Sequence, residues 1–461
     1  MSYLLIHTIM KNNKKILNKT IKIINKYYDH SEKKPVLKYK SPATLKKEIK
    51  LDIAKKWMSI NSLFSEIEKI ALNSPKTNSK WFFNLLVGGE ILPAVMAEML
   101  TAVLNNTMHT YKSAGIHILI EQEVIKFLLK KVGYKKGDGM FWPGWSLTNM
   151  IALIIARNKK YSSIKKSGIG NKKLVWYTSD QAHYSTEKFI SVTWLGKQAI
   201  REIPTDDKWK MDIKQLEETI ISDIKQGYIP FYINATAWTT VLGAFDPIEK
   251  ISKIAKKYKL RLHTDAALGW WALLSKKHKS LLKWIEQSDS VSWSLHKMMN
   301  VPLLAAVLLT KNPDILYKNF NENADYLFQM DDKNLNPGNK SIQCGRRNDA
   351  FKVWTALKYL WEDGYEKRIN NEFTNAKYAT SIIKKDKDFT LVLEPECINV
   401  CFQVKGKSAS KLCEALDKQG LIKVGYGKRK WKEFIRLITV NADMTKKDIE
   451  NFFKHVKNVK I

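Results

Sequence analysis

Short apolar runs alternate with helical segments between about residues 138 and 310, and this alternation constrains the fold of the 461-residue chain most strongly. The runs have the character of buried β-strands and occupy residues 174–178, 228–233, 261–264, 290–293 and 305–309. Helical patterns occupy residues 146–156, 213–224 and 247–258. Strand–helix alternation of this kind predicts an α/β fold with a mostly parallel sheet.

The two ends of the chain have different patterns. Residues 1–60 are rich in lysine with weak helical periodicity, and residues 61–135 and 350–385 are also helical in pattern. The tail, about 386–461, mixes strand-like and helical stretches and predicts a small α+β unit. We expect a helical N-terminal segment (1–100), a large domain (101–365) and a small C-terminal α+β domain (366–461).

Composition excludes several classes of protein. No apolar run reaches the roughly 18–20 residues that span a bilayer, so we expect no membrane segment. The four cysteines form no CxxC pair and lie near no histidine cluster, so we expect no metal site and a reducing, cytoplasmic location. The net charge of +33 invites a nucleic-acid role. We disfavour specific nucleic-acid binding because most lysines are scattered, although the charge could attract acidic substrates.

The sequence places two residues of particular chemistry about thirty positions apart, Asp265 and Lys297. Asp265 ends an apolar run and is followed by small residues, so its carboxylate can face a flat cationic ring. A lysine that does covalent chemistry must be poorly solvated and held in place. In this order they suit pyridoxal 5'-phosphate (PLP), which needs a Schiff-base lysine and a carboxylate at its ring nitrogen. An ordinary helix cap is the alternative for Asp265.

Three further segments carry candidate ligands. Ser146 opens a helix after Pro143-Gly144, where free N–H groups could bind phosphate, although most such stretches are simply capped turns. His183 follows a β-run and could stack on a cofactor ring, or could be an ordinary surface histidine. Thr236 ends another run, and open α/β sheets bind ligands at the carboxyl ends of their strands.

With these segments in place, the chain resembles the group II PLP-dependent amino-acid decarboxylases, and is similar within them to the glutamate and cysteine-sulfinate decarboxylases. The resemblance extends from about Trp81 to the C-terminus. Its motifs include Phe82-Phe83-Asn84, Gly137-Asp138-Gly139, Tyr326-Leu327-Phe328-Gln329, Gln343-Cys344-Gly345-Arg346-Arg347, Asn399-Val400-Cys401-Phe402 and Phe434-Ile435-Arg436-Leu437. It implies a PLP-dependent transferase fold of type I, with a seven-stranded sheet, and a homodimer with shared active sites and wrapping N-terminal segments.

The resemblance also implies a role for each candidate residue. Lys297 would hold PLP, Asp265 would pair with the ring nitrogen, and His183 and Ala267 would cover the two ring faces. Thr236 would lie near the ring oxygen. The phosphate site would involve Ser146, Leu147, Ser294 and His296. Arg436 would bind the α-carboxylate of the substrate, and Tyr326, on a mobile loop, would supply the proton that replaces CO2.

The resemblance predicts a carboxy-lyase that converts an L-amino acid to its amine and CO2. Leu85 stands where glutamate decarboxylases have a glutamine, and His109 replaces an aromatic residue of the same pocket. Glutamate, aspartate and cysteine sulfinate therefore all stay open as substrates. The alternatives are another PLP-dependent lyase or aldehyde synthase, and a catalytically impaired homologue.

Tryptophan is the main departure from the family. The chain has 15 tryptophans and only 20 glycines, although glycine is normally about 7% of residues. Eight tryptophans stand where the resembling family has glycine: Trp145, Trp194, Trp209, Trp238, Trp270, Trp271, Trp284 and Trp361. Trp431 is a possible ninth. We hypothesise that UGA codons encode glycine at the eight positions; a divergent enzyme with genuine tryptophans is the alternative.

Overall fold

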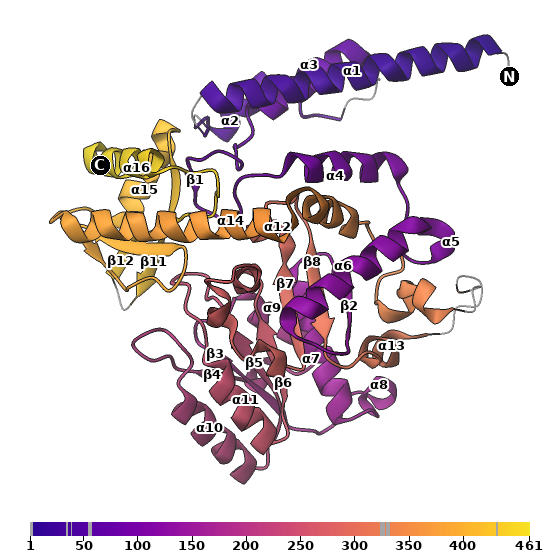
Figure 1. Cartoon of the computed structure of the whole chain (residues 1–461), viewed down its shortest axis with the longest axis vertical. Helices are drawn as coiled ribbons and strands as arrows, with labels where there is room; N and C mark the ends of the chain where they lie inside the picture. Colours follow the sequence, from indigo (N-terminus) through magenta and orange to yellow (C-terminus); the bar gives the residue numbers. More distant parts are fainter. Residues whose placement is uncertain are drawn as a thin grey trace. The chain divides into compact units, whose positions relative to one another are not determined.

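The structure is a computed structural model that describes residues 3–33, 36–37, 39–53, 58–322, 328, 332–429 and 432–461 (Figure 1). The chain divides into two compact units, which are considered separately. The large unit comprises Glu90–Thr380 and Leu393–Cys401, and the small unit comprises Met1–Gly89, Ser381–Val392 and Phe402–Ile461. These units do not test the three predicted domains, which stay a prediction.

A seven-stranded sheet forms the centre of the large unit, in the order β2-β8-β7-β6-β5-β3-β4. Strands β7, β6, β5, β3 and β4 are parallel to one another. Strand β8 is antiparallel to both of its neighbours, β2 and β7. The strands are β2 (Asp138–Trp142), β3 (Leu174–Ser179), β4 (Ile200–Ile203), β5 (Ile229–Thr236), β6 (Arg261–Asp265), β7 (Ser290–Ser294) and β8 (Ala306–Thr310). The predicted fold class, with its mostly parallel seven-stranded sheet, is confirmed.

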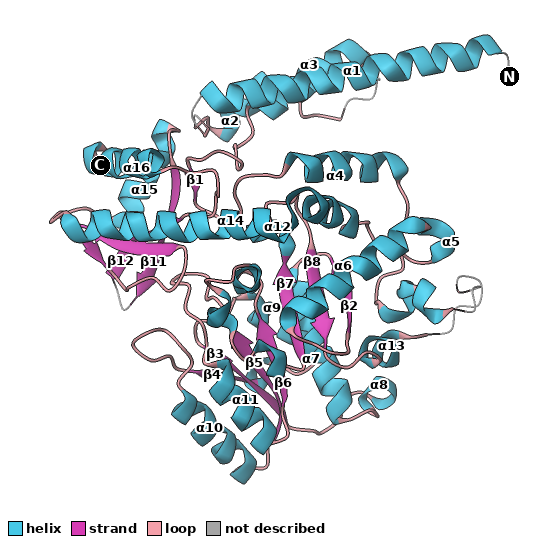
Figure 2. Ribbon diagram, viewed as in Figure 1, coloured by secondary structure: helices cyan, strands magenta, loops and turns pink. Residues whose placement is uncertain are grey.

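Helices surround this sheet (Figure 2). Those of the large unit are α4 (Leu92–Leu104), α5 (Tyr111–Ala114), α6 (Ile116–Val132), α7 (Trp145–Lys160), α8 (Ile164–Ser167), α9 (Ser185–Val192), α10 (Ile213–Lys225), α11 (Ile248–Lys257), α12 (Leu295–Met298), α13 (Ile315–Phe320) and most of α14 (Ala350–Lys385). No helix in the described part is both long and apolar enough to cross a membrane.

Helix α7 is apolar on two sides and is buried in the large unit. Ile151 and Ile155 pack with residues of β2, β8 and α13, whereas Leu153 and Ala156 pack with residues of β3, β5 and α9. Burial on two sides fixes the helix firmly on the sheet. Its first residues are therefore held at the same edge as the carboxyl ends of the parallel strands.

The small unit contains most of a second sheet, in the order β1-β11-β12-β10-β9. Its strands are β1 (Phe82–Phe83), β9 (Phe389–Leu391), β10 (Asn399–Val404), β11 (Lys423–Arg429) and β12 (Lys432–Ile438). The helices of this unit are α1 (Tyr3–Lys33), α2 (Pro42–Glu48), α3 (Ile60–Leu72), α15 (Ala409–Gln419) and α16 (Lys446–Asn458). The expected small C-terminal sheet is thus present.

Candidate active site

Asp265, Thr236 and Lys297 meet at the carboxyl edge of the large sheet. Thr236 is paired with Asp265 across β5 and β6, and Asp265 is paired with Ser292 across β6 and β7. Lys297 lies on the short helix α12, which follows β7 directly. All three candidate side chains are buried. Parallel pairing therefore brings together residues that are far apart in the sequence.

The carboxylate of Asp265 is held by two N–H donors. Asn149, on α7, donates its side-chain amide to Oδ2 at 2.6 Å, and the backbone N–H of Ala267 donates to Oδ1 at 3.0 Å. Both donors are uncharged, so the carboxylate still has capacity to accept a further hydrogen bond from a cation. This arrangement suits a protonated ring nitrogen.

Asn149 is a functional candidate that the sequence analysis did not single out. Its amide oxygen lies 3.1 Å from Nε2 of His263, whose Nδ1 lies 2.9 Å from the Ser290 hydroxyl. Burial lowers the pKa of His263 to about 3, so the imidazole is neutral near pH 7. The local sequence gave no signal for Asn149, because its partner lies 116 residues away.

Several polar atoms around Lys297 are buried without a hydrogen-bond partner among the described residues. These are the hydroxyls of Thr236 and Ser294 and Nε2 of His296. Burial lowers the pKa of His296 to about 4, and its Nδ1 accepts from the backbone N–H of Ala305 at 3.0 Å. Unsatisfied buried polar groups are unusual in native proteins, and they suit a site that binds a polar ligand.

His183 lies in the same region, after β3. Its Nδ1 accepts from the backbone N–H of Ser185 at 3.2 Å and lies 2.8 Å from the Ser185 hydroxyl. Burial lowers its pKa, and the nearby negative charge of Asp265 acts in the opposite direction. A neutral, oriented imidazole is suited to lie flat against an aromatic ring.

Trp145 fills the space that these groups surround. The Lys297 ammonium lies 4.1 Å from the centroid of the indole, and the rings of His183 and His296 lie 5.4 and 5.8 Å from it. The indole N–H is buried and has no partner among the described residues. The polar groups around this space therefore fit PLP. Trp145 is incompatible with PLP, because the ring of PLP and the indole cannot occupy the same volume.

The other candidates are distributed differently. Ser146 and Leu147 lie in the first turn of α7, and Ala267 follows β6. Buried His109 is in the large unit, with a pKa that burial lowers. Leu85 and Arg436 belong to the small unit, where Nη2 of Arg436 donates to the carbonyl of Asn84 at 2.8 Å. Tyr326 and Trp431 lie outside the described residues.

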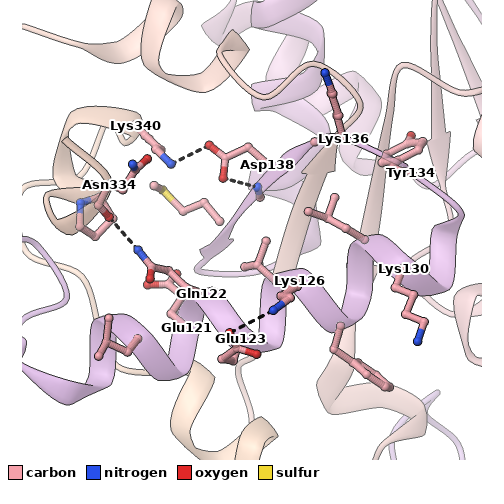
Figure 3. A pocket seen from close by; sticks show the side chains of 18 of the residues that line it. Glu121, Gln122, Glu123, Lys126, Lys130, Tyr134, Lys136, Asp138, Asn334 and Lys340 are labelled. Atoms are coloured by element: carbon pink, nitrogen blue, oxygen red, sulfur yellow. Dashed lines mark hydrogen bonds and ion pairs between the residues drawn. The ribbon is translucent and has the colours of Figure 1, made fainter. Parts of the chain in front are cut away.

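A large cavity of the large unit lies away from this constellation, between α6, β2 and residues 332–340 (Figure 3). Lys340 pairs with Asp138 at 2.7 Å, and the side-chain amide of Gln122 donates to the Asn334 carbonyl at 2.9 Å. None of the predicted site residues lines this cavity. Because it contains none of these residues, it is a poor candidate for the active site.

Comparisons with known proteins agree with this geometry. The pyridoxal-dependent decarboxylase conserved domain matches residues 42–405. The acidic amino acid decarboxylase GADL1 of Mus musculus is 35% identical over 93% of this chain and 82% of its own. The cysteine sulfinic acid decarboxylase of Homo sapiens is 35% identical over 90% of this chain and 89% of its own.

Solved structures show the same likeness. The crystal structure of mouse CSAD superposes with a TM-score of 0.93 and 31% identity, covering 97% of this chain and 98% of that one. The structure of Oryza sativa TDC with PLP and tryptamine superposes with a TM-score of 0.89 at 20% identity, a likeness of fold alone. The chain belongs to the pyridoxal-dependent decarboxylase family, whose members use PLP to decarboxylate amino acids.

Proposed function

We propose that this chain decarboxylates an acidic amino acid, namely glutamate, aspartate or cysteine sulfinate, to its amine and CO2. The observation that carries the chemistry is the buried pair of Asp265, at the end of β6, and Lys297, on the helix that follows the neighbouring strand β7. The names of the most similar relatives support an acidic substrate. The net charge of +33 supports it too, because a positive field raises the local concentration of an anion.

The proposed roles follow from the chemistry of each group. The amine of Lys297 binds the aldehyde of PLP, and Asp265 keeps the ring nitrogen protonated so that the ring can withdraw electrons. His183 and Ala267 cover the ring, and Thr236 lies near the ring oxygen. The phosphate is bound by Ser146, Ser294, His296 and the backbone of Leu147. These unpartnered or oriented polar groups support the assignment.

Substrate recognition is proposed for residues outside this cluster. Arg436 binds the α-carboxylate of the substrate, because guanidinium pairs well with carboxylate. Leu85 and His109 line the side-chain pocket, and Tyr326 donates the proton to Cα after CO2 leaves. The Tyr326→Phe variant is expected to lose amine formation while it still binds PLP; unchanged amine formation would contradict the role.

The experiment is a substrate panel with the native protein and PLP. We expect CO2 and the corresponding amine from at least one of glutamate, aspartate and cysteine sulfinate, and little from leucine. The Lys297→Ala variant is the control, because it lacks the amine that binds the coenzyme. CO2 release from neutral or aromatic amino acids alone would contradict an acidic substrate.

We further propose a cytoplasmic homodimer with shared active sites. Four cysteines in 461 residues support a reducing compartment. The exposed apolar side chains of α4, which include Leu92, Met96 and Val103, support burial against a partner. Light scattering of the native protein at micromolar concentration is expected to give twice the mass of the chain, and a monomer would contradict the proposal.

A further inference from the structure

Five tryptophans have a backbone conformation that favours glycine. Eight described residues other than glycine have positive φ, and five of these are Trp194, Trp209, Trp238, Trp284 and Trp361, with φ between 53° and 88°. The others are Asn105, Lys259 and Asn300. Asparagine tolerates this region, but a bulky residue there is a genuine outlier. Tryptophan is therefore concentrated where side chains are least tolerated.

The described tryptophans outside the eight positions provide an internal control. Trp81, Trp142, Trp176, Trp293 and Trp354 are described and none has positive φ. All five left-handed tryptophans are among the eight positions at which the resembling family has glycine. A general feature of tryptophan would affect both groups alike, whereas a replaced glycine explains why only one group is left-handed.

Two of these positions are sites where glycine has a specific structural role. Trp194 comes two residues after α9 ends at Val192, and its N–H donates back to the Ser191 carbonyl. A left-handed residue just past a helix end is usually glycine. Trp361 interrupts α14 with φ 53° and ψ −176°, a region open essentially to glycine alone. Both indoles are largely exposed, at 85% and 63%, so little burial offsets the strain.

Trp145 adds an independent argument, based on space rather than on φ. Its indole occupies the volume enclosed by Lys297, His183 and His296. A glycine at this position leaves the backbone of α7 in place and opens that volume to a flat ring. Trp270 and Trp271 are different, because their indole N–H groups donate to Ser294 and Glu372 and their rings are well packed. Geometry alone does not select glycine there.

We infer that the functional protein has glycine at all eight positions, encoded by UGA, and that glycine at position 145 opens the PLP site. The five left-handed positions and position 145 carry the inference. Trp270 and Trp271 are included because the resembling family has glycine there too. At the five left-handed positions the inference rests on backbone geometry and does not depend on the proposed function. Only the opening of the PLP site rests on that proposal.

The first test is the gene and the native protein. We expect UGA codons at the eight positions and peptide masses that match glycine at each of them. Peptides containing Trp293 and Trp354 are the matched control and should have UGG codons and tryptophan masses. UGG codons at the five left-handed positions, or tryptophan masses there, would overturn the inference. Neither measurement requires a folded recombinant protein.

The second test is PLP binding by two full-length forms, one with tryptophan and one with glycine at the eight positions. Titration is followed by the visible absorbance of bound PLP. We expect the glycine form to bind at least tenfold more tightly. A form with tryptophan at position 145 and glycine at the other seven positions should lose this gain in affinity. A form with tryptophan only at the exposed position 194 of the eight should keep it. Equal affinity with and without Trp145 would overturn its role as the obstruction.

The outcomes separate the two proposals. UGA codons with glycine masses, together with a glycine form that binds PLP but releases no CO2 from any acidic amino acid, would leave the inference standing and refute the proposed function. UGG codons in a protein that decarboxylates an acidic amino acid would refute the inference and leave the proposed function standing.

Discussion

At the scale of single residues, the position of Asp265 depends on a neighbour in space rather than in sequence. The Asn149 amide donates to its carboxylate and also contacts His263, so one side chain joins α7 to β6. A hydrogen bond to a charged group is worth about 1.5–3 kcal/mol. The orientation of Asp265, and with it the affinity for PLP, should therefore be sensitive to this residue.

We expect the Asn149→Ala variant, made in the glycine form, to bind PLP roughly ten- to a hundredfold more weakly, which is the range that follows from one such hydrogen bond. PLP titration by absorbance measures the change. Asn158→Ala is the matched control, because Asn158 is buried on the same helix and bonds to Asn319. It should lower stability but leave PLP affinity unchanged. Equal losses of affinity in both variants would show that the effect is only structural.

His263 predicts how stability depends on pH. Its pKa is lowered by burial to about 3 from 6.5, so the folded protein excludes a proton that the unfolded chain accepts. Stability is therefore fully present above pH 6.5 and falls as the pH drops toward 3. Between pH 6.5 and 5 the loss from this residue is about 2 kcal/mol. His263→Gln should reduce the loss by a similar amount in urea unfolding; an identical slope in both proteins would contradict the assignment.

The sequence identified Asp265 and Lys297 because Asp265 ends one apolar run and Lys297 comes a few residues after the next, so both belong near the carboxyl ends of strands. It could not identify Asn149, whose side chain becomes important only when α7 packs across the sheet. The sequence marks Trp145 only as a position at which the resembling family has glycine. The structure adds that the indole lies against the amine of Lys297, a contact that depends on a rotamer and cannot be deduced from the sequence.

At the scale of elements, α14 offers a paired test of the tryptophan positions. Trp354 and Trp361 lie on the same helix, but only Trp361 has positive φ. We expect Trp361→Gly to stabilise the protein by about 1–3 kcal/mol, through relief of backbone strain. Trp354→Gly should destabilise it by at least about 1 kcal/mol, because glycine is unfavourable in a regular helix. The urea unfolding midpoints of both variants measure these changes in stability. A lower midpoint for Trp361→Gly would contradict the proposed backbone strain at this position.

The strands that the sequence predicted and those it missed differ in a physical way. The five predicted runs became β3, β5, β6, β7 and β8 within one to three residues. All five lie inside the sheet and are almost entirely buried. The other two, β2 and β4, lie at the edges of the sheet. β2 begins with Asp-Gly and β4 contains Arg201 and Glu202, so their composition resembles that of loops.

At the scale of the whole molecule, the net charge of +33 should affect how substrates are captured. The Debye length falls from about 10 Å at 0.1 M salt to about 3 Å at 1 M. We therefore expect the KM for an acidic amino acid to rise severalfold over this range, while kcat stays nearly constant. Initial rates at several salt concentrations measure this. A KM that does not depend on salt would show that the field has no role in substrate capture.

Helix α7 begins at residue 145 and reaches Asp265 through Asn149, one turn later. Ser146 and Asn149 are three residues apart and share a face of the helix, with a rise of about 1.5 Å for each residue. The length of this helical turn thus sets the spacing between the proposed phosphate site and the group that faces the ring nitrogen of the coenzyme. We expect a coenzyme analogue with a longer phosphate arm to reach either the phosphate site or Asp265, but not both. Helix α7 would then select its ligand by length.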